Sequence, residues 1–447
     1  MAAGAPRWLG CLAAAWVSLA LASGEEVAPV PASRSERPSN GWYRQGRAEG
    51  LFRSGLQGRA GASSARRRTP GAGEDGPVRV VLHGRERPDE VAVSGGASLG
   101  CDGRPVPAAA AWTLRREGGR VRLVERERTG TARECRRVSV SAPEGLNAGG
   151  HCRGRAAFSL RAGTLQRCHE GTLEVRAQGN ALHLVLMLPL ERYVASVLVS
   201  EAGDAPAEAL AAQAVVTRTW ALAHRGRHGS ADACDLTHCQ LYRGEQAPHA
   251  DAAAARTAGQ VLRHGGEPVP AFFHAACGGH TAEARAVFGV TGRGASDGER
   301  GPVAVADVGP DGRPWCAEAP WHFELARRAL AEALRLPPRG SVRVLGRTVD
   351  GRVREVEAFG RVMGGPRFVA EVTRALGYGT LKGARFRVQQ DGEVLRFEGE
   401  GRGHGVGFCQ VGAAARARAG QGYEALLHAY FPAAEVSPPR RAIPPAP

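Results

Sequence analysis

A glutamate at the end of an apolar helical stripe is the residue best placed to do chemistry in this sequence. A helix over residues 190–201 turns about 100° per residue, and one side of it carries Leu190, Val194, Val197 and Leu198. Glu201 follows about three turns after Leu190, at the centre of that stripe. Burial raises the pKa of a carboxyl group, so that it can donate a proton at neutral pH. The alternative is a helix that ends at Ser200, with Glu201 a solvated loop acid.

Four residues of metal-binding type lie close together at His228, Cys234, His238 and Cys239. Two thiols and two imidazoles match the composition of a zinc site. Such an ion would be structural rather than catalytic, because four protein ligands leave no open position. The spacing is not that of a standard zinc finger, since His238 directly precedes Cys239. The alternative is a disulfide, either Cys234–Cys239 or Cys239–Cys277.

The elements around these residues indicate an α+β fold, mostly β with a few embedded helices, including the helix pair that carries Glu201. The pair consists of the helix at 190–201 and a second one that runs through Trp220. Strand-like runs separated by glycine-rich turns precede it. These runs are Trp112–Leu114, Val121–Val124, Arg137–Val140, Leu173–Ala177 and Leu182–Met187.

The region after the helix pair returns to strands. Residues 257–273 predict a strand–turn–strand unit with Gly265 and Gly266 in the turn. Residues 323–336 predict a helix that ends before Pro337 and Pro338. Further strands are expected at Val342–Leu345, Val353–Phe359, Phe386–Gln389 and Val394–Glu398, with a short helix at Tyr423–Tyr430.

The charge of the chain limits its partners. The 447 residues are enough for two or three domains, and the formal net charge is +15. Lys382 is the only lysine, so almost all of the positive charge comes from arginine. Such a charge favours binding to an anionic partner, which could be nucleic acid, an anionic membrane or an acidic cell-wall polymer.

The N-terminus narrows this choice. Arg7 precedes a short apolar run from Trp8 to Ala22, which predicts a secretory signal peptide at residues 1–22. An uncleaved membrane anchor is the alternative. We therefore expect a protein of the cell envelope, in the periplasm or cell wall, and not a partner of nucleic acid.

The remaining boundaries follow from composition. Residues 23–77 are rich in Arg, Gly, Ser and Pro and predict a disordered linker. Residues 437–447 predict a proline-rich tail. Nine cysteines follow the signal peptide and are disulfide candidates outside the cytosol. Because the count is odd, at least one is free, metal-bound or paired between chains. The oligomeric state does not follow from the sequence.

Five segments in register resemble the stage II sporulation protein D family, also called the amidase-enhancer family. The first segment is Leu190-Glu191-Arg192-Tyr193-Val194 followed by Glu201, Arg218 and Trp220. The others are Asp235 with His238–Gly244, Phe273–Thr281, Pro314-Trp315-Cys316, and Gly401–Ala413. The resemblance covers about residues 78–436 and implies one domain over that range.

The resemblance implies a lytic transglycosylase that cuts peptidoglycan glycan strands already stripped of their stem peptides. Its products would carry 1,6-anhydromuramoyl ends. The essential acid of the family corresponds to Glu201, and Arg218 corresponds to an arginine that would stabilise negative charge or bind substrate. The alternative for Arg218 is a surface or structural arginine. The chemistry requires no cofactor. The resemblance also implies a partner, an N-acetylmuramoyl-L-alanine amidase, and supports structural zinc at the His228–Cys239 loop.

Further residues would then line the glycan-binding cleft. Gln213 and Trp220 lie on one stripe of the second helix, where Trp220 would stack on a sugar. His274 and Gln410 lie in family motifs, and His404 lies in a glycine-rich loop whose backbone can approach a ligand closely. For Trp220 and Gln213 the alternative is a place in the core, and for His274 it is a buried structural histidine.

The sequence also departs from the family pattern. Ala202 follows Glu201 where relatives usually carry Met and then Pro, and Arg402, Phe408 and Cys409 replace Trp, Met and Ser. These differences leave two other functions open. One is a non-catalytic glycan binder that activates an amidase, and the other is a zinc hydrolase that uses the His228–Cys239 loop. Sporulation itself does not follow, since such proteins also serve division or wall turnover.

Overall fold

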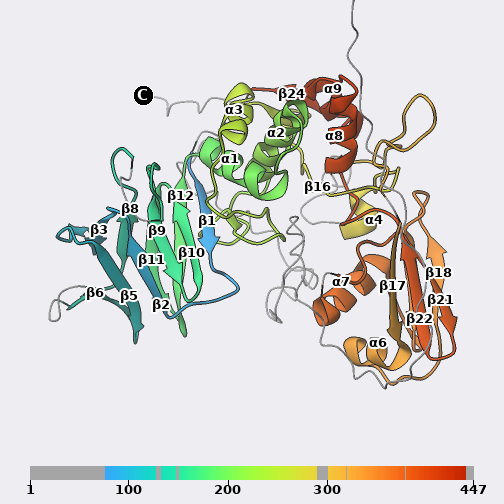
Figure 1. Cartoon of the computed structure of the whole chain (residues 1–447), viewed down its shortest axis with the longest axis horizontal. Coiled ribbons are helices and arrows are strands. Elements are labelled where there is room, and N and C mark those ends of the chain that lie inside the picture. The colour runs from blue at the N-terminus through green and yellow to red at the C-terminus, as the bar shows by residue number, and fades with distance from the viewer. Residues whose placement is uncertain are drawn as a thin grey trace, which may run out of the picture. The chain divides into compact units, whose positions relative to one another are not determined.

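The computed structural model describes residues 76–126, 132–146, 151–288, 301–318, 320–377 and 379–438. They form an α+β fold with several sheets and embedded helices, as the sequence predicts (Figure 1). The expected signal peptide, nearly all of the expected linker and most of the expected tail lie outside the described residues. Within the described ranges no helix is both long and apolar enough to span a membrane.

Two sheets form the N-terminal part of the described chain. The larger has the strand order β13-β1-β12-β11-β8-β3-β4. Its strands are β1 (Val78–Leu82), β3 (Ser98–Cys101), β4 (Arg104–Pro105), β8 (Val138–Ser141), β11 (Thr172–Gln178), β12 (Ala181–Leu188) and β13 (Ala233–Cys234). The smaller has the order β10-β9-β2-β5-β6-β7. Its strands are β2 (Glu90–Ser94), β5 (Ala111–Glu117), β6 (Arg120–Glu125), β7 (Ala132–Cys135), β9 (Phe158–Ala162) and β10 (Leu165–His169).

Alternating side chains explain why these strands share one core. In β1 every second residue is buried, and in β5 the buried residues are Trp112 and Leu114. Such a period of two places one face of a strand against the core. Four of the five predicted strand runs lie within β5, β6, β11 and β12, and the fifth overlaps β8 from Val138 onward.

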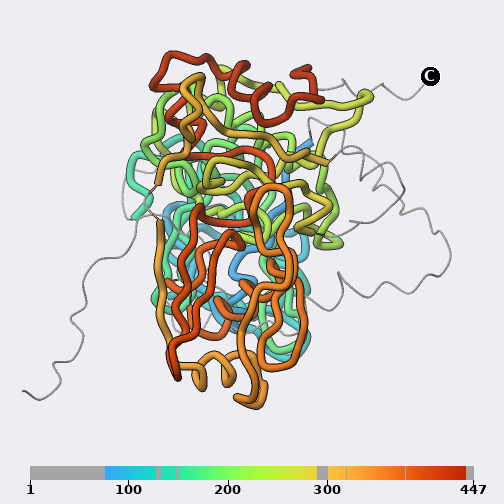
Figure 2. Tube along the Cα trace, turned by 90° about the vertical axis from the view of Figure 1, so that its right-hand side faces the viewer, coloured from blue at the N-terminus to red at the C-terminus, as the bar shows by residue number. Residues whose placement is uncertain are grey.

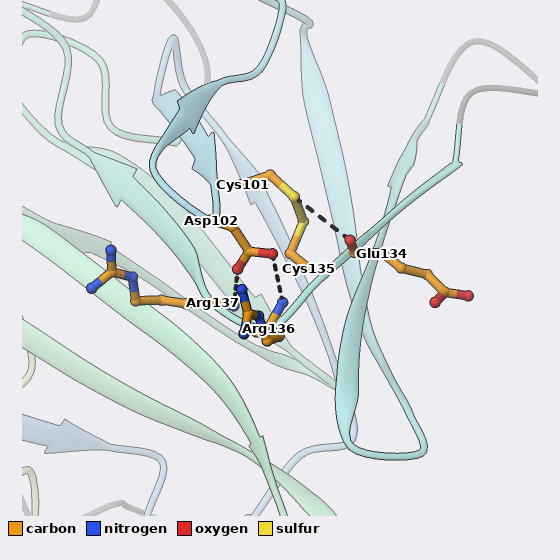
Figure 3. Close-up of a disulfide and its surroundings, with 6 residues drawn as sticks. All are labelled: Cys101, Asp102, Glu134, Cys135, Arg136 and Arg137. Carbon is orange, nitrogen blue, oxygen red and sulfur yellow. Dashed lines mark hydrogen bonds between the residues drawn. A yellow bond between two sulfur atoms is a disulfide. The ribbon is translucent and has the colours of Figure 1, made fainter.

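Two disulfides link strands and loops of this region. Cys101 is bonded to Cys135, and Cys152 is bonded to Cys168. Beside the first bridge, the Asp102 carboxylate accepts hydrogen bonds from the backbone amides of Arg136 and Arg137 (Figure 3). Disulfides form in oxidising compartments outside the cytosol. The two bridges therefore indicate an extracytoplasmic domain.

Three helices follow β12, with the short β13 between the second and the third. They are α1 (Leu190–Glu201), α2 (Ala207–Ala223) and α3 (Pro248–Arg256). The bounds of α1 agree with the prediction. Every residue of α2 from Ala209 to Ala221 is buried, which is typical of a helix packed on all sides. The sequence analysis missed α3, which is rich in alanine and packs its Ala250, Ala253 and Ala254 against α1 and α2.

Short sheets and helices make up the other elements after α3, outside residues 321–399. The predicted turn at Gly265 and Gly266 is confirmed, because it joins β14 (Val261–His264) to β15 (Glu267–Pro268), and β24 (Glu435–Ser437) pairs on the other edge of β14. Two strands distant in sequence, β16 (Phe273–His274) and β23 (Phe408–Cys409), pair in parallel. The helices are α4 (Ala284–Phe288), α8 (Gln410–Arg418) and the predicted α9 (Tyr423–Tyr430).

Residues 321–399 have a hydrophobic core of their own. Two three-stranded sheets, β17-β22-β21 and β18-β19-β20, enclose it with two helices, and Figure 2 shows this segment in orange. The elements are β17 (Trp321–Ala326), α6 (Arg327–Leu334), β18 (Val342–Arg347), β19 (Val353–Ala358), β20 (Arg361–Gly364), α7 (Gly365–Leu376), β21 (Phe386–Asp391) and β22 (Val394–Gly399).

The predicted helix at 323–336 is wrong in its first part. Residues 321–326 form β17, which pairs along its whole length with β22, and only 327–334 are helical. Trp321, Phe323 and Leu325 alternate with polar residues, and this period of two fits a strand. Apolar residues continue without a break from β17 into α6, and for this reason the sequence pattern predicts one helix over the whole segment.

Candidate functional site

Glu201 lies at the C-terminal end of α1, where a buried helix meets the loop that follows β13. Val194, Val197 and Leu198 of the predicted stripe are fully buried. The helix includes Glu201 and does not end at Ser200. The Glu201 side chain is partly exposed, and its Oε1 accepts a hydrogen bond from the Leu241 amide at 2.8 Å. The backbone carbonyl of Glu201 accepts a second bond from Gln410 Nε2 at 3.2 Å.

The surroundings of Glu201 hold it close to half-protonated at neutral pH. Burial raises the pKa of its carboxyl to about 7, while the Leu241 amide and the charge of Arg243 lower it by less. Within the described part of the chain, no second carboxylate is among the groups that set this pKa. A group with a pKa near the working pH can both donate and accept a proton.

Arg218 is fully buried and its guanidinium faces Glu191 rather than Glu201. Its Nε and Nη2 donate to the two carboxylate oxygens of Glu191 at 2.8 and 2.5 Å. It also donates to the backbone carbonyls of Ala254 and Gln260. Because Glu191 lies in the first turn of α1 and Ala254 lies in α3, Arg218 of α2 joins the three helices around Glu201.

Gln213 and Trp220 lie in the interior on α2. Gln213 is 1% exposed, and its Oε1 has no hydrogen-bond partner among the described residues. Trp220 is 3% exposed and stacks on His224 with ring centroids 4.4 Å apart. An aromatic cluster continues from His224 to the partly exposed Phe272, which contacts both Phe288 and His404.

The paired strands β16 and β23 bring His274, His404 and Gln410 into one region. His274 is fully buried, and its ring centroid lies 5.7 Å from that of His404. Burial lowers the pKa of both imidazoles, that of His404 to about 4, so both are neutral at pH 7. Gln410 alone among these three is joined to Glu201 by a hydrogen bond.

The glycine-rich loop before β23 needs its glycines for close packing. Gly405 and Gly407 have φ values of 81° and 72°. A side chain at Gly407 would collide with the carbonyl of Phe272, and one at Gly405 with Arg352. The loop therefore packs against protein, which positions Phe408 and Cys409 for pairing with β16.

The four predicted metal ligands of the His228–Cys239 loop come together. One ligand atom from each of His228, Cys234, His238 and Cys239 lies within 4.8 Å of all the others. His228 Nε2 lies 3.0 Å from Cys239 Sγ, and His238 Nδ1 lies 3.4 Å from Cys234 Sγ. Neither predicted disulfide forms, because Cys234, Cys239 and Cys277 are all free.

The electrostatics of this loop fit a metal ion. Burial opposes ionisation of the Cys239 thiol, but hydrogen bonds with Cys234, His228 and His238 outweigh it and hold the pKa of Cys239 well below its usual value. The hydrogen bond with Cys239, together with burial, raises the pKa of Cys234, so Cys239 is the thiol of the pair that ionises first. The Leu236 amide also points at Cys234 Sγ, at 3.4 Å. Amide donors of this kind stabilise metal-bound thiolates, so the donor set is suited to a zinc ion.

Three features of the site were not predicted from the sequence. The first is the Leu241 amide, which no side-chain motif reveals, although it lies inside the family-like segment at 238–244. The second is Arg243, whose charge acts on Glu201. The third is the aromatic cluster at Phe272 and Phe288, which could be found only once these residues were placed next to His404.

Comparisons with known proteins agree with the motifs. Residues 178–264 match the family model described as Stage II sporulation protein. This range contains α1, α2, Glu201 and the whole His228–Cys239 loop. An uncharacterized protein of Brachyspira hyodysenteriae is 27% identical over 267 residues, which are 58% of this chain and 70% of that protein.

Two named relatives are also similar. Stage II sporulation protein D of Bacillus amyloliquefaciens is 24% identical over 295 residues, 60% of this chain and 80% of that protein. Amidase enhancer of Bacillus subtilis is 36% identical over 63 residues, 14% of this chain and 9% of that protein. Residues 178–264 thus carry the match to the stage II sporulation protein family model, and the chain is distantly similar to both named proteins.

The buried Arg218 makes Glu191 a test of the helix assembly. Glu191→Gln should lower the free energy of unfolding by about 3 kcal/mol, because a buried guanidinium loses its counter-charge. Arg328→Gln is the matched control, since the Arg328–Glu332 pair is 81% and 67% exposed and is expected to contribute less than about 1 kcal/mol. Urea denaturation measures both. Equal losses in the two variants would contradict a structural role for the Arg218–Glu191 pair.

Proposed function

We propose that the protein is a peptidoglycan lytic transglycosylase in which Glu201 is both the general acid and the general base. The observation that carries the proposal is a single partly exposed carboxyl with a pKa of about 7 at the end of a buried helix. The similarity to Stage II sporulation protein D and amidase enhancer supports a role in the cell wall.

One carboxyl is enough for this reaction. Most glycosidases need two carboxylates, because one protonates the leaving oxygen and the other attacks C1 or activates water. In the proposed reaction the C6 hydroxyl of muramic acid attacks its own C1. Glu201 donates its proton to the glycosidic oxygen as the C1–O bond breaks, and it then accepts the C6 hydroxyl proton as the new C1–O6 bond forms. No water is consumed, and Glu201 ends in its starting state.

Arg243 offers an explanation for a preference for peptide-stripped strands. It is partly exposed and close enough to Glu201 to lower the pKa of that carboxyl. Removal of the stem peptide leaves a free lactyl carboxylate on muramic acid. A guanidinium is the side chain best suited to pair with a carboxylate. We therefore assign Arg243 to the lactyl group of the sugar that reacts at Glu201.

The other candidate residues divide between the interior and the substrate side. Gln410 is proposed to contact substrate, since it is partly exposed and bonded to the Glu201 backbone. His404 is proposed to present its neutral ring with Phe272 to a sugar face. The burial of Gln213, Trp220 and His274 supports a role in positioning these groups. Arg218 likewise supports Glu201 through α1.

The His228–Cys239 loop is proposed to hold a structural zinc ion with two thiolates and two imidazoles. When bound, the ion would cross-link the loop and supply no open coordination position. Cys239 precedes Leu241 by two residues, so the loop conformation sets where the Leu241 amide meets Glu201. This arrangement favours a supporting role for the metal over hydrolysis at it.

Replacement of Glu201 tests the proposal directly. The chain from residue 23, as wild type and as Glu201→Gln, is incubated with peptide-stripped glycan strands, and the products are read by mass spectrometry. Wild type should release 1,6-anhydromuramoyl fragments, with a rate that falls as the pH rises above about 7 because the acid form is lost. Glu201→Gln should lose at least about 100-fold in rate.

Asp204→Asn is the matched control, because Asp204 is exposed three residues further along the chain. It should retain the wild-type rate. If wild type binds the strands but releases no fragments, the enzyme proposal fails, and a glycan-binding activator of an N-acetylmuramoyl-L-alanine amidase becomes the better description. The similarity to amidase enhancer gives that outcome its own support.

The role of Arg243 predicts two effects of Arg243→Gln. The KM for stripped strands should rise about tenfold, the equivalent of one exposed charge-assisted hydrogen bond. The alkaline limb of the pH profile should also move to higher pH, because a charge that lowers the Glu201 pKa is gone. Arg418→Gln, at an exposed position on α8, should change neither. An unchanged KM would contradict the assignment.

A further inference from the structure

A second group of metal-ligand side chains lies outside the His228–Cys239 loop. One ligand atom from each of its four members lies within 4.8 Å of all the others, and all four residues are buried. They are Cys277, Asp307, Cys316 and Cys409. Cys277 follows β16, Cys409 ends β23, and the other two lie between α4 and β17. The fold thus brings together three separate parts of the sequence.

The sulfur atoms of this group are surrounded by hydrogen-bond donors. The amides of Gly278 and Gly279 point at Cys316 Sγ at 2.9 and 3.1 Å. The amides of Cys277 and Gly412 point at Cys409 Sγ, both at 3.3 Å. Several amides directed at sulfur are the arrangement that stabilises metal-bound thiolates.

Asp307 is held in place as a ligand would be. Its Oδ2 lies 3.3 Å from Cys277 Sγ and accepts a hydrogen bond from the Tyr430 hydroxyl at 3.0 Å. Its Oδ1 accepts from Arg416 Nε at 3.0 Å. Partners behind a carboxylate fix its orientation toward a metal. The Arg416 charge also offsets part of the negative charge that three thiolates and a carboxylate would bring.

We propose a second zinc site, with ligands Cys277, Asp307, Cys316 and Cys409. Three thiolates and one carboxylate complete a tetrahedral shell and leave no open position, which is typical of structural zinc. In such a shell the sulfurs lie about 3.8 Å apart. The Sγ atoms of Cys277 and Cys316 are 2.9 Å apart, which is longer than a disulfide bond of about 2.05 Å. The two sulfur atoms would therefore have to move apart by only about 0.9 Å to bind an ion between them.

The second site would brace the region next to Glu201. Cys409 directly precedes Gln410, which donates to the Glu201 carbonyl. Cys277 lies three residues after His274, and His274 in β16 pairs directly with Cys409 in β23. A bound ion would therefore fix the β16–β23 pair and the start of α8. This inference does not rest on the proposed transglycosylase activity, because metal content is measured without substrate.

Metal stoichiometry tests the second site. The chain from residue 23 is purified after expression with zinc, and zinc per chain is measured by inductively coupled plasma mass spectrometry. Wild type should hold two zinc ions. Cys316→Ser should hold one, and so should His238→Ala, which removes a ligand of the other loop only. The double variant should hold none. Wild type with no more than one ion, lost entirely in His238→Ala, would overturn the proposal.

A second measurement on wild type covers the case in which Cys316→Ser does not fold. The thiols are counted with a chromogenic disulfide reagent after denaturation with chelator. The five free cysteines of the structure predict five thiols. A count of three, with the Cys277–Cys316 disulfide found by peptide mapping, would overturn the site. Native mass spectrometry of wild type should show the mass of two zinc ions, and the absence of the second ion would also overturn it.

Discussion

A carboxyl with a pKa near 7 requires surroundings that remove most of its water but leave one side open. At Glu201, water is excluded on the side of α1, whose residues Val194 to Leu198 are buried against the sheets and against α2 and α3. The Leu241 amide supplies a hydrogen bond, which stabilises the ionised form without overcoming the desolvation. The other parts of the site depend on this balance. Arg218 holds the three helices together, and the His228–Cys239 loop presents the Leu241 amide.

The sequence was sufficient for features that depend on local periodicity. The stripe from Leu190 to Leu198 predicted both the length of α1 and the place of Glu201 in it, because the pattern of a helix repeats within a few residues. The hairpin at Gly265 and Gly266 followed from turn chemistry. The strand β17 was missed because its short period-two run leads without a break into α6. The short alanine-rich α3 carries little amphipathic signal, and α7 and α8 were also missed.

Features that depend on long-range contacts could not be predicted. Arg218 and Glu191 belong to different helices, and only the fold shows that the arginine is fully buried against this glutamate. The cysteines behave in the same way. Their number and compartment predicted disulfides, but the pairs Cys101–Cys135 and Cys152–Cys168, and the free state of the five other cysteines that the structure describes, follow from tertiary structure. Asp307 had no motif that marked it as a partner of cysteines.

The pH dependence of stability tests the account of Glu201 most directly. The folded pKa of about 7 lies above the unfolded value near 4.5, so the folded chain binds the extra proton between these values. The stability that this proton confers is present at low pH and is lost as the pH rises through about 7. Glu201→Gln mimics the protonated form. Its melting temperature should therefore stay close to that of wild type at pH 4.5, exceed it progressively as the pH rises to about 7, and keep a nearly constant advantage above that pH. A difference that stays constant from pH 4.5 to about 7 would contradict the desolvated carboxyl on which the proposed mechanism depends.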